Sequence, residues 1–293
     1  MFNNFVLEHI DMGEATLRVR HGGSGPPLLL LHGHPQTHVC WHLVAPQLAA
    51  HFTVVCPDLR GYGESSKPPT KPDHEPYSKR AMAKDMISLM SSLGHERFAV
   101  AGHDRGGYVS YRLALDHPER IEKLAVLDIV PAFEAWRQVD AQFMLRWWHW
   151  AFMAQPAPLA ESLFVANPDA YYFRSGRDRF HPEALADYLR AVHNSETVHA
   201  MCEDYRANAT YDRALDAADY HEGKRIRCPV LVLWGKHDDM EDFYGDPLAV
   251  WRDWADDVHG RGLECGHYLA EEKPDELVAE LKAFFSAKNW QRS

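Results

Sequence analysis

A glycine-flanked segment near position 104 has residue types and spacing that could do covalent chemistry. Gly102-His-Asp104-Arg-Gly106 follows an apolar run and precedes an amphipathic stretch, which is the strand–turn–helix setting of a nucleophile elbow. Small residues suit this sharp turn because the central side chain must stand free of the backbone. The central residue is Asp104, so a serine esterase is excluded. A polar turn that caps the following helix is the alternative for this segment taken alone.

Partners for Asp104 stand near both ends of the sequence. The HGHP turn places His34 where its backbone N–H, together with that of Arg105, would form an oxyanion hole. His267, in ECGHY, follows the last apolar run and precedes a helical stretch, where the general base of such a hydrolase is expected. Asp128 and Asp238 each end a predicted strand, and either could orient the histidine.

An aspartate nucleophile has a particular chemical use. Attack by serine at an sp³ carbon would leave an ether, which water does not cleave under mild conditions, whereas a carboxylate leaves an ester. Water activated by His267 could then attack the Asp104 carbonyl carbon, with the oxyanion hole accepting the charge. The sequence therefore predicts a covalent alkyl-ester intermediate, formed by dehalogenation or by epoxide opening.

These residues must be positioned by a sheet. Short apolar runs bounded by Gly, Pro or Asp alternate with helical stretches, which predicts a parallel sheet covered on both faces. The runs are LLLLHGHP, FTVVCPDLRGYG, FAVAGHDRGG, LAVLDIVP and PVLVLWGKHD, and the segment ATLRVRHGG before them predicts a strand pair. The expected class is α/β: an α/β-hydrolase fold with a mostly parallel central sheet and helices on both faces.

The strand pattern is interrupted between about residues 131 and 212, where the sequence is aromatic-rich and helical. We expect an inserted all-helical cap over the active edge, with core segments at 1–130 and 213–293. An independent helical domain is the alternative, but neither junction has a Gly/Ser linker.

Composition narrows the class of partner. A formal net charge of -11 argues against nucleic acid and anionic membranes, and no apolar run approaches the ~18 residues of a membrane helix. The first residues lack a signal peptide pattern, and five cysteines without a CxxC pair suit reduced thiols, so a cytoplasmic location is expected.

No cofactor motif occurs, and His32, His34 and His38 lack an acid or cysteine at ligand spacing, so neither a cofactor nor a metal is expected. The expected partner is a small-molecule substrate.

Several segments together resemble the fluoroacetate (haloacetate) dehalogenases, from about residue 25 to residue 285. They are HGHPQ, DLRGYGESSKP, GHDRGG, YRLALDHPER, LAVLDIVP, WWHW, CEDYRA and ECGHYLAEEKPDE. The resemblance implies that Asp104 is the nucleophile, His267 the base and Asp128 the acid that orients it. It also implies a homodimer formed through the cap.

The resemblance assigns binding roles as well. Arg105 would hold the substrate carboxylate, because its forked donors match two carboxylate oxygens. His149, Trp150 and Tyr205 would donate hydrogen bonds to the departing halide. Without the resemblance, the WWHW segment would be interpreted as an aromatic packing patch under the cap.

Two positions depart from the family pattern. Family members typically carry a second carboxylate-binding arginine four residues after the nucleophile, where this sequence has Tyr108. Tyr108 lies on the same helix face one turn after Asp104, so it should face the substrate and bind it with one hydrogen bond. A hydroxyl supplies no charge, and losing a charge-assisted bond costs about 1.5–3 kcal/mol of binding. Asp238 is the other departure, and it keeps open which acid orients His267.

We therefore expect hydrolytic dehalogenation of a small 2-haloacid. Epoxide hydrolysis with the same nucleophile is the alternative, with the hydroxyl groups of Tyr171, Tyr172, Tyr188, Tyr205 and Tyr211 as candidate acids. A non-catalytic ligand receptor on the same scaffold would not need a base beside the Asp104 carboxylate.

Overall fold

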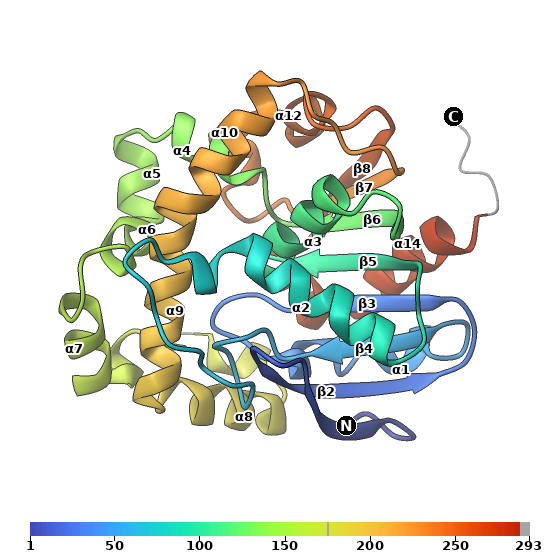
Figure 1. The fold of residues 1–293 in the computed structure, drawn as a ribbon, viewed down its shortest axis with the longest axis horizontal. Helices are drawn as coiled ribbons and strands as arrows, with labels where there is room; N and C mark the ends of the chain where they lie inside the picture. The colour runs from blue at the N-terminus through green and yellow to red at the C-terminus, as the bar shows by residue number, and fades with distance from the viewer. Residues whose placement is uncertain (175, 288–293) are drawn as a thin grey trace.

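A twisted sheet of eight strands forms the centre of the protein (Figure 1). The computed structural model describes residues 1–174 and 176–287. The spatial order of the strands is β1-β2-β4-β3-β5-β6-β7-β8. Their bounds are β1 (Val6–Asp11), β2 (Thr16–Gly23), β3 (Pro27–Leu31), β4 (Thr53–Pro57), β5 (Phe98–His103), β6 (Ile121–Leu127), β7 (Val230–Gly235) and β8 (Val258–Leu263).

The sheet is mostly parallel, as predicted. β1 pairs with β2 and β2 with β4 in antiparallel fashion, whereas every pair from β4 to β8 is parallel. All six residues of β7 are buried, and so are the last four of β3 and of β6, because helices cover both faces. The predicted α/β-hydrolase architecture is confirmed.

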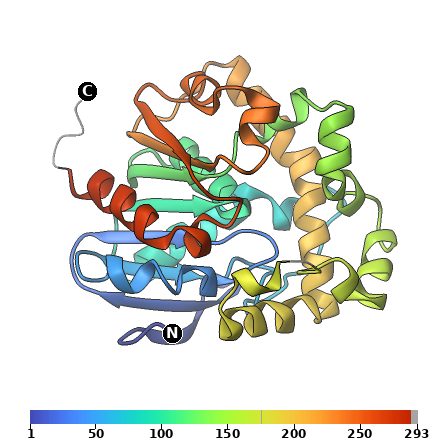
Figure 2. The same ribbon diagram turned by 180° about the vertical axis from the view of Figure 1, so that it is seen from behind.

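The covering helices divide between the two faces of the sheet (Figures 1 and 2). On one face α2 (Lys79–Ser92) packs against α3 (Arg105–Asp116), and α3 crosses β5 and β6. On the other face lie α1 (Ala45–Leu48) and α14 (Pro274–Ser286). Shorter elements complete the core: η1 (His38–Trp41), η2 (Glu75–Tyr77), α11 (Met240–Tyr244), α12 (Pro247–Arg252) and α13 (Leu269–Glu272).

Between β6 and β7 the described residues form helices only, and these lie beyond the carboxyl ends of the parallel strands (Figure 1). They are α4 (Ala132–Arg137), α5 (Ala141–Arg146), α6 (Trp148–Met153), α7 (Leu159–Ala166), η3 (Pro168–Ala170), η4 (Arg177–Arg179), α8 (Pro182–Val192), α9 (Ser195–Ala207), the π-helical turn η5 (Asn208–Asp212) and α10 (Arg213–His221). The division into core and cap at residues 131–212 stays a prediction, and residue 212 lies inside the continuous helical run from α9 to α10.

That helical run is tied to α3 at two places. Near the start of α3, Arg105 is paired with Asp204 of α9. Near its end, Arg112 is paired with Asp216 of α10, which also accepts a 2.6 Å hydrogen bond from the Tyr111 hydroxyl. The helix that begins at the predicted nucleophile is therefore joined to this helical run near both of its ends.

The outer surface of the cap carries several exposed apolar side chains. Six large hydrophobic residues on α5, α6 and α7 are more than one third exposed: Met144, Leu145, Trp148, Leu159, Leu163 and Val165. A homodimer through this surface stays a prediction. Within the described ranges, the helices are all too short or too polar to span a bilayer.

Candidate active site

Asp104 lies at the elbow between β5 and α3. Its backbone has φ 48° and ψ -118°, a conformation that side-chain-bearing residues rarely adopt and that is typical of strained functional turns. Neighbouring positions must be glycine because the chain packs tightly there. A Cβ on Gly102 would lie 2.2 Å from the Gly106 carbonyl oxygen, and one on Gly106 would lie 2.4 Å from the Leu31 carbonyl oxygen. The sharp strand–turn–helix geometry expected around Asp104 is therefore present, and the role of Asp104 as nucleophile stays a prediction.

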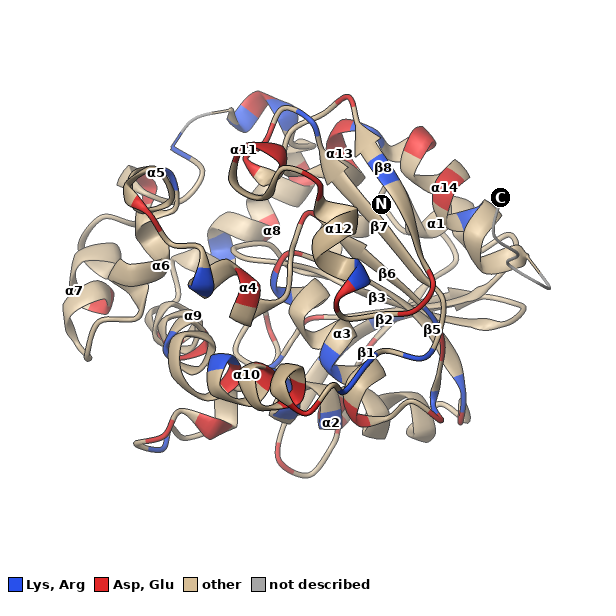
Figure 3. Cartoon of the chain, turned by 90° about the horizontal axis from the view of Figure 1, so that it is seen from above, with Lys and Arg blue, Asp and Glu red and all other residues tan. Residues whose placement is uncertain are grey.

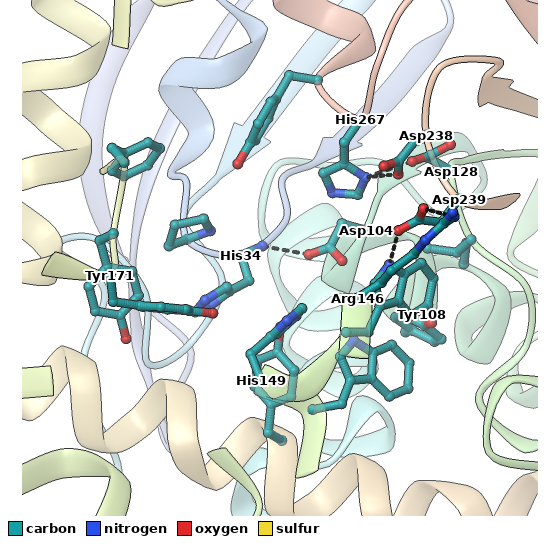
Figure 4. Close-up of a pocket in the computed structure, with 18 residues that line it drawn as sticks. His34, Asp104, Tyr108, Asp128, Arg146, His149, Tyr171, Asp238, Asp239 and His267 are labelled. Atoms are coloured by element: carbon teal, nitrogen blue, oxygen red, sulfur yellow. Dashed lines mark hydrogen bonds and ion pairs between the residues drawn. The ribbon is translucent and has the colours of Figure 1, made fainter. Parts of the chain in front are cut away.

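The Asp104 carboxylate is held at one oxygen only. Its Oδ1 accepts a 2.7 Å hydrogen bond from the backbone N–H of His34, the first predicted oxyanion-hole donor (Figure 4). Burial opposes ionisation, but the nearby charges of His267 and Arg105 outweigh it and lower the pKa of Asp104. The carboxylate is therefore ionised, with Oδ2 left free. The N–H of Arg105 stays a prediction as the second donor.

His267 follows β8 and stands across from Asp104 in Figure 4. Its Nδ1 donates to Asp128 Oδ2 at 2.6 Å and lies 3.3 Å from Asp238 Oδ2. Asp128 is fixed further, because its Oδ1 accepts a 2.9 Å bond from the backbone N–H of Gly235 and its backbone has a positive φ of 58°. Both candidate acids thus reach the imidazole, and the shorter bond belongs to Asp128.

The two carboxylates and the imidazole titrate together. Burial, reinforced by the adjacent Asp238, raises the pKa of Asp128 to about 8. Burial alone would lower the pKa of His267, but hydrogen bonds to both carboxylates raise it well above its ordinary range. These three residues are also the one group in the described part of the chain whose spacing could suit a metal ion. The bond from Nδ1 to Asp128 accounts for that spacing.

His103 is a supporting residue to which the sequence assigned no role. Its ring packs against that of His267, with centroids 4.5 Å apart, and its Nε2 lies 2.7 Å from the His267 carbonyl oxygen. Burial lowers the pKa of His103 to about 3, so the ring is neutral and can donate to that carbonyl. Its position beside Asp104 in the GHDRG segment is the signal that could have identified it.

A cavity of about 340 Å³ opens between these core residues and the cap, near the lower end of the range for ligand pockets, roughly 300–1,000 Å³. Eight of the nine predicted site residues line it: His34, Asp104, Tyr108, Asp128, His149, Trp150, Tyr205 and His267. Asp238 lines it as well. The structure therefore gathers residues from six other segments of the chain around Asp104.

The three predicted halide-binding residues face this cavity with donors that are not in use. Neither His149, the Trp150 indole N–H nor the Tyr205 hydroxyl makes a hydrogen bond to any described residue. Burial lowers the pKa of His149 to about 4, so its ring is neutral and offers one N–H. Because these donors lie at the cavity wall without a partner among the described residues, they are free to bind an acceptor in the cavity.

Arg105 is the predicted site residue that does not line the cavity. Its Nε and Nη2 bond to Asp204, at 3.1 and 2.9 Å, and its guanidinium stacks 4.0 Å from the Tyr205 ring centroid. Only Nη1 remains, buried and without a partner among the described residues. In this arrangement Arg105 therefore cannot form two parallel hydrogen bonds to a substrate carboxylate. Asp204, within the CEDYRA segment, was not predicted as its partner.

Charged side chains bridge cap and core at one side of the cavity. Arg146, at the end of α5, lies 2.6 Å from both Asp239 and Asp242, the second of which belongs to the acidic helix α11 (Figures 3 and 4). The indole N–H of Trp147 also donates to Asp239, at 2.8 Å. Arg146 and Asp239 both line the cavity, and neither was predicted from the sequence.

Comparison with known proteins shows the family to which the chain belongs. Residues 26–274 match the family model described as the alpha/beta hydrolase fold. A fluoroacetate dehalogenase from Burkholderia sp is 43% identical over 98% of this chain and 95% of that protein. A soluble epoxide hydrolase from Corynebacterium sp. (strain C12) is 33% identical over 90% of this chain and 91% of its own length.

Among solved structures, a protein from Nostoc sp PCC 7120, provisionally described as an alpha/beta hydrolase, superposes with a TM-score of 0.95. It is 48% identical, with 98% of this chain and 99% of that chain covered. The predicted resemblance to fluoroacetate dehalogenases is confirmed, and the chain belongs to the α/β-hydrolase family.

Proposed function

We propose that this protein is a hydrolytic dehalogenase that converts a small 2-haloacid to the 2-hydroxyacid and a halide ion. The observation that carries the proposal is the set of unused cap donors on His149, Trp150 and Tyr205, which share one cavity with an ionised Asp104. A halide leaves as an anion, so donors without competing partners stabilise it as the carbon–halogen bond breaks.

In the first step Asp104 Oδ2 attacks the carbon that bears the halogen. A C–O bond forms, the carbon–halogen bond breaks, and the halide takes the bonding electron pair. The His34 N–H holds Oδ1, so the attacking oxygen is the one without a hydrogen bond in the structure. The low pKa of Asp104 keeps the nucleophile ionised.

In the second step water cleaves the ester. His267 Nε2 takes a proton from the water, whose oxygen attacks the Asp104 carbonyl carbon, and negative charge develops on Oδ1. That oxygen already accepts the His34 N–H, so its stabilisation requires no rearrangement. When the intermediate collapses, the bond between the Asp104 carbonyl carbon and Oδ2 breaks, and Oδ2 leaves with the substrate and takes the proton from His267 to give the hydroxyacid. Asp104 loses its remaining proton to solvent and is again a carboxylate. Asp128, bonded to Nδ1, fixes the tautomer that leaves Nε2 free.

Recognition of the substrate carboxylate is the weaker part of the site. Arg105 contributes positive charge from behind the Tyr205 ring and has only Nη1 unpaired. Tyr108 lines the cavity and can donate one hydrogen bond, without charge. We expect haloacids to bind about 1.5–3 kcal/mol less tightly than they would with a second arginine at position 108.

Epoxide hydrolysis is the second candidate, and cavity tyrosines favour it. Tyr171, Tyr172 and Tyr205 line the cavity, and the Tyr172 hydroxyl is buried without a partner among the described residues. Phenols of this kind could donate to an epoxide oxygen. Tyr188 bonds instead to Glu271 at 3.0 Å, and neither Tyr188 nor Tyr211 lines the cavity.

Parallel incubations with fluoroacetate, chloroacetate and a neutral epoxide test the proposal, with halide release and diol formation as readouts. We expect halide from both acids. Diol without halide would replace the proposal with the epoxide reaction. In the His267→Gln variant, mass spectrometry should detect a carboxymethyl ester on the peptide that contains Asp104, because the second step is blocked. Ligand binding that persists without any turnover would indicate a receptor.

A further inference from the structure

The HGHP turn carries an imidazole that nothing in the proposed mechanism uses. His34 serves that mechanism through its backbone N–H alone, yet its side chain is 8% exposed and lines the cavity. Both ring nitrogens are buried and have no hydrogen-bond partner among the residues that the structure describes. Such a side chain is expected to meet a polar group of a ligand.

The neighbouring histidines differ from His34 because their rings have hydrogen-bond partners. His32, two residues earlier, accepts a 3.0 Å hydrogen bond from the backbone N–H of Leu59. His38 lies 2.7 Å from the Asp58 carboxylate through its Nδ1. Both rings are therefore engaged in holding the loops of the core, whereas the ring of His34 is turned into the cavity.

The His34 ring adjoins the cap donors. Its centroid lies 5.2 Å from that of Tyr205, edge to face, and the Tyr205 ring in turn lies 5.7 Å from that of His149. Figure 4 shows His34 and His149 near one another on the side of Asp104 away from His267. His34, Tyr205 and His149 thus form a continuous row beside the nucleophile.

The ring is neutral. Burial lowers the pKa of His34 to about 3, so the imidazole carries one N–H donor and one lone pair. A neutral donor can stabilise a departing anion without transferring a proton to it.

We propose that the His34 imidazole N–H is a fourth donor to the leaving halide, beside His149, Trp150 and Tyr205. This inference rests on the proposed dehalogenase function. As the carbon–halogen bond breaks and the halogen takes the electron pair, the imidazole N–H donates to the forming halide. Fluoride concentrates its charge in the smallest volume, so its release depends most on each donor.

His34→Phe and His34→Gln test whether the imidazole donates to the halide, because both variants keep the backbone N–H that holds Asp104. The rates to compare are halide release from fluoroacetate and from bromoacetate. We expect His34→Phe to lower the ratio of fluoride to bromide release at least tenfold and His34→Gln, which keeps an N–H donor, to recover part of it. His42→Phe is the matched control, since His42 is a buried histidine outside the cavity.

The outcomes separate this inference from the proposed function. If the wild-type protein releases both halides and the ratio is the same in His34→Phe, the fourth-donor role is wrong and the proposed function stands. If the wild-type protein releases no halide, the proposed function fails. Chloride binding, followed by the fluorescence of Trp147 and Trp150 in the cavity, then tests His34 alone. Weaker chloride binding by His34→Phe supports the donor role, and equal binding overturns it.

Discussion

The two walls of the cavity differ in how fully their polar groups are paired. On the core side, Asp104 is held by the His34 N–H, His267 by Asp128, and Asp128 by the Gly235 N–H. On the cap side, the donors of His149, Trp150 and Tyr205 have no partner among the described residues. The polar groups on the core side are therefore held by other residues, while those on the cap side are free to bind a ligand. We infer that the core residues would determine the type of reaction and the cap residues the substrate.

The comparisons fit this division. Proteins described as a fluoroacetate dehalogenase and as a soluble epoxide hydrolase both resemble this chain over most of its length. Both activities could use an aspartate, a histidine and an acid on the core side. The cap donors would then decide which leaving group departs.

Substituting the core nucleophile should have the largest effect. In Asp104→Asn no ester can form, so turnover should fall on the order of 10⁶-fold, as in other enzymes that lose a covalent nucleophile. Halide release is the measurement, and Asp104→Ala is the companion variant because an asparagine can hydrolyse back to aspartate. Substantial turnover in Asp104→Ala would mean that the ester mechanism is wrong.

The next largest effect should distinguish the two acids of the core. Asp128→Asn removes the shorter bond to His267, and a misoriented base typically costs on the order of 10⁴-fold in kcat. Asp238→Asn removes the 3.3 Å contact and should cost less than about tenfold. The reverse order of kcat values would assign the orienting role to Asp238.

On the cap side, Tyr205→Phe should lower fluoride release about 10²-fold, the effect of removing one well-placed donor from a developing anion. Bromide release should fall less, because bromide needs less stabilisation. Tyr211→Phe is the control, since Tyr211 lies outside the cavity. Equal losses for both halides would point to a positioning role for Tyr205 in place of halide donation.

The pH dependence of kcat should follow the ionisation of His267 on the core side of the cavity. His267 acts as a base only when neutral, and the two carboxylates raise its pKa well above the ordinary 6.5, so activity should increase with pH above that value. Asp238→Asn removes one of these carboxylates, so the pKa of His267 should fall and the acid limb should move to lower pH. A pH profile of kcat that is unchanged or shifted upward would contradict this coupling.

The smallest effect should come from the bridge between cap and core. Arg146 and Asp239 are partly exposed, 39% and 21%, and such ion pairs contribute about 0–1 kcal/mol. Arg146→Gln removes the cation that neutralises Asp239 and Asp242, so KM for a haloacid should rise up to about fivefold, while KM for a neutral epoxide should be unaffected. Arg146→Lys is the matched control. An equal rise for the epoxide would indicate a change in cap position.

The sequence predicted the core side well, because its signals are local. Asp104 and Asp128 each follow an apolar run, and parallel strands bring their carboxyl ends to one edge of the sheet, so these two residues were expected to lie close together. β8 is the strand for which the sequence offered least, since Val258–Leu263 contains two glycines, a histidine and an arginine. The hydrogen bonds to β7 hold this segment as a strand, although its residue types do not favour one.

The cap and the charge pairs were harder to predict because they depend on contacts distant in sequence. The resemblance identified His149, Trp150 and Tyr205, but no local pattern shows that Arg105 pairs with Asp204, which lies 99 residues further along the chain. Arg146 and Asp239 are 93 residues apart. Whether a charged side chain faces a substrate or an internal partner is settled only by the packing of the cap.

The number of residues in the helical run through α9, η5 and α10 determines where Tyr205 lies relative to Asp104. Tyr205 and Asp216 lie on this run, and the neighbouring salt bridges tie both of its parts to α3, the helix that begins at the elbow. An α-helix turns about 100° per residue, so one added or deleted residue between them would rotate Tyr205 away from Asp104 or break the link to α3. The π-helical turn at Asn208–Asp212 has more residues per turn than an α-helix, so it determines the rotation of α9 relative to α10 about the helix axis. Loops between the other cap helices can change length and reshape the cavity, whereas this run must keep its residue count.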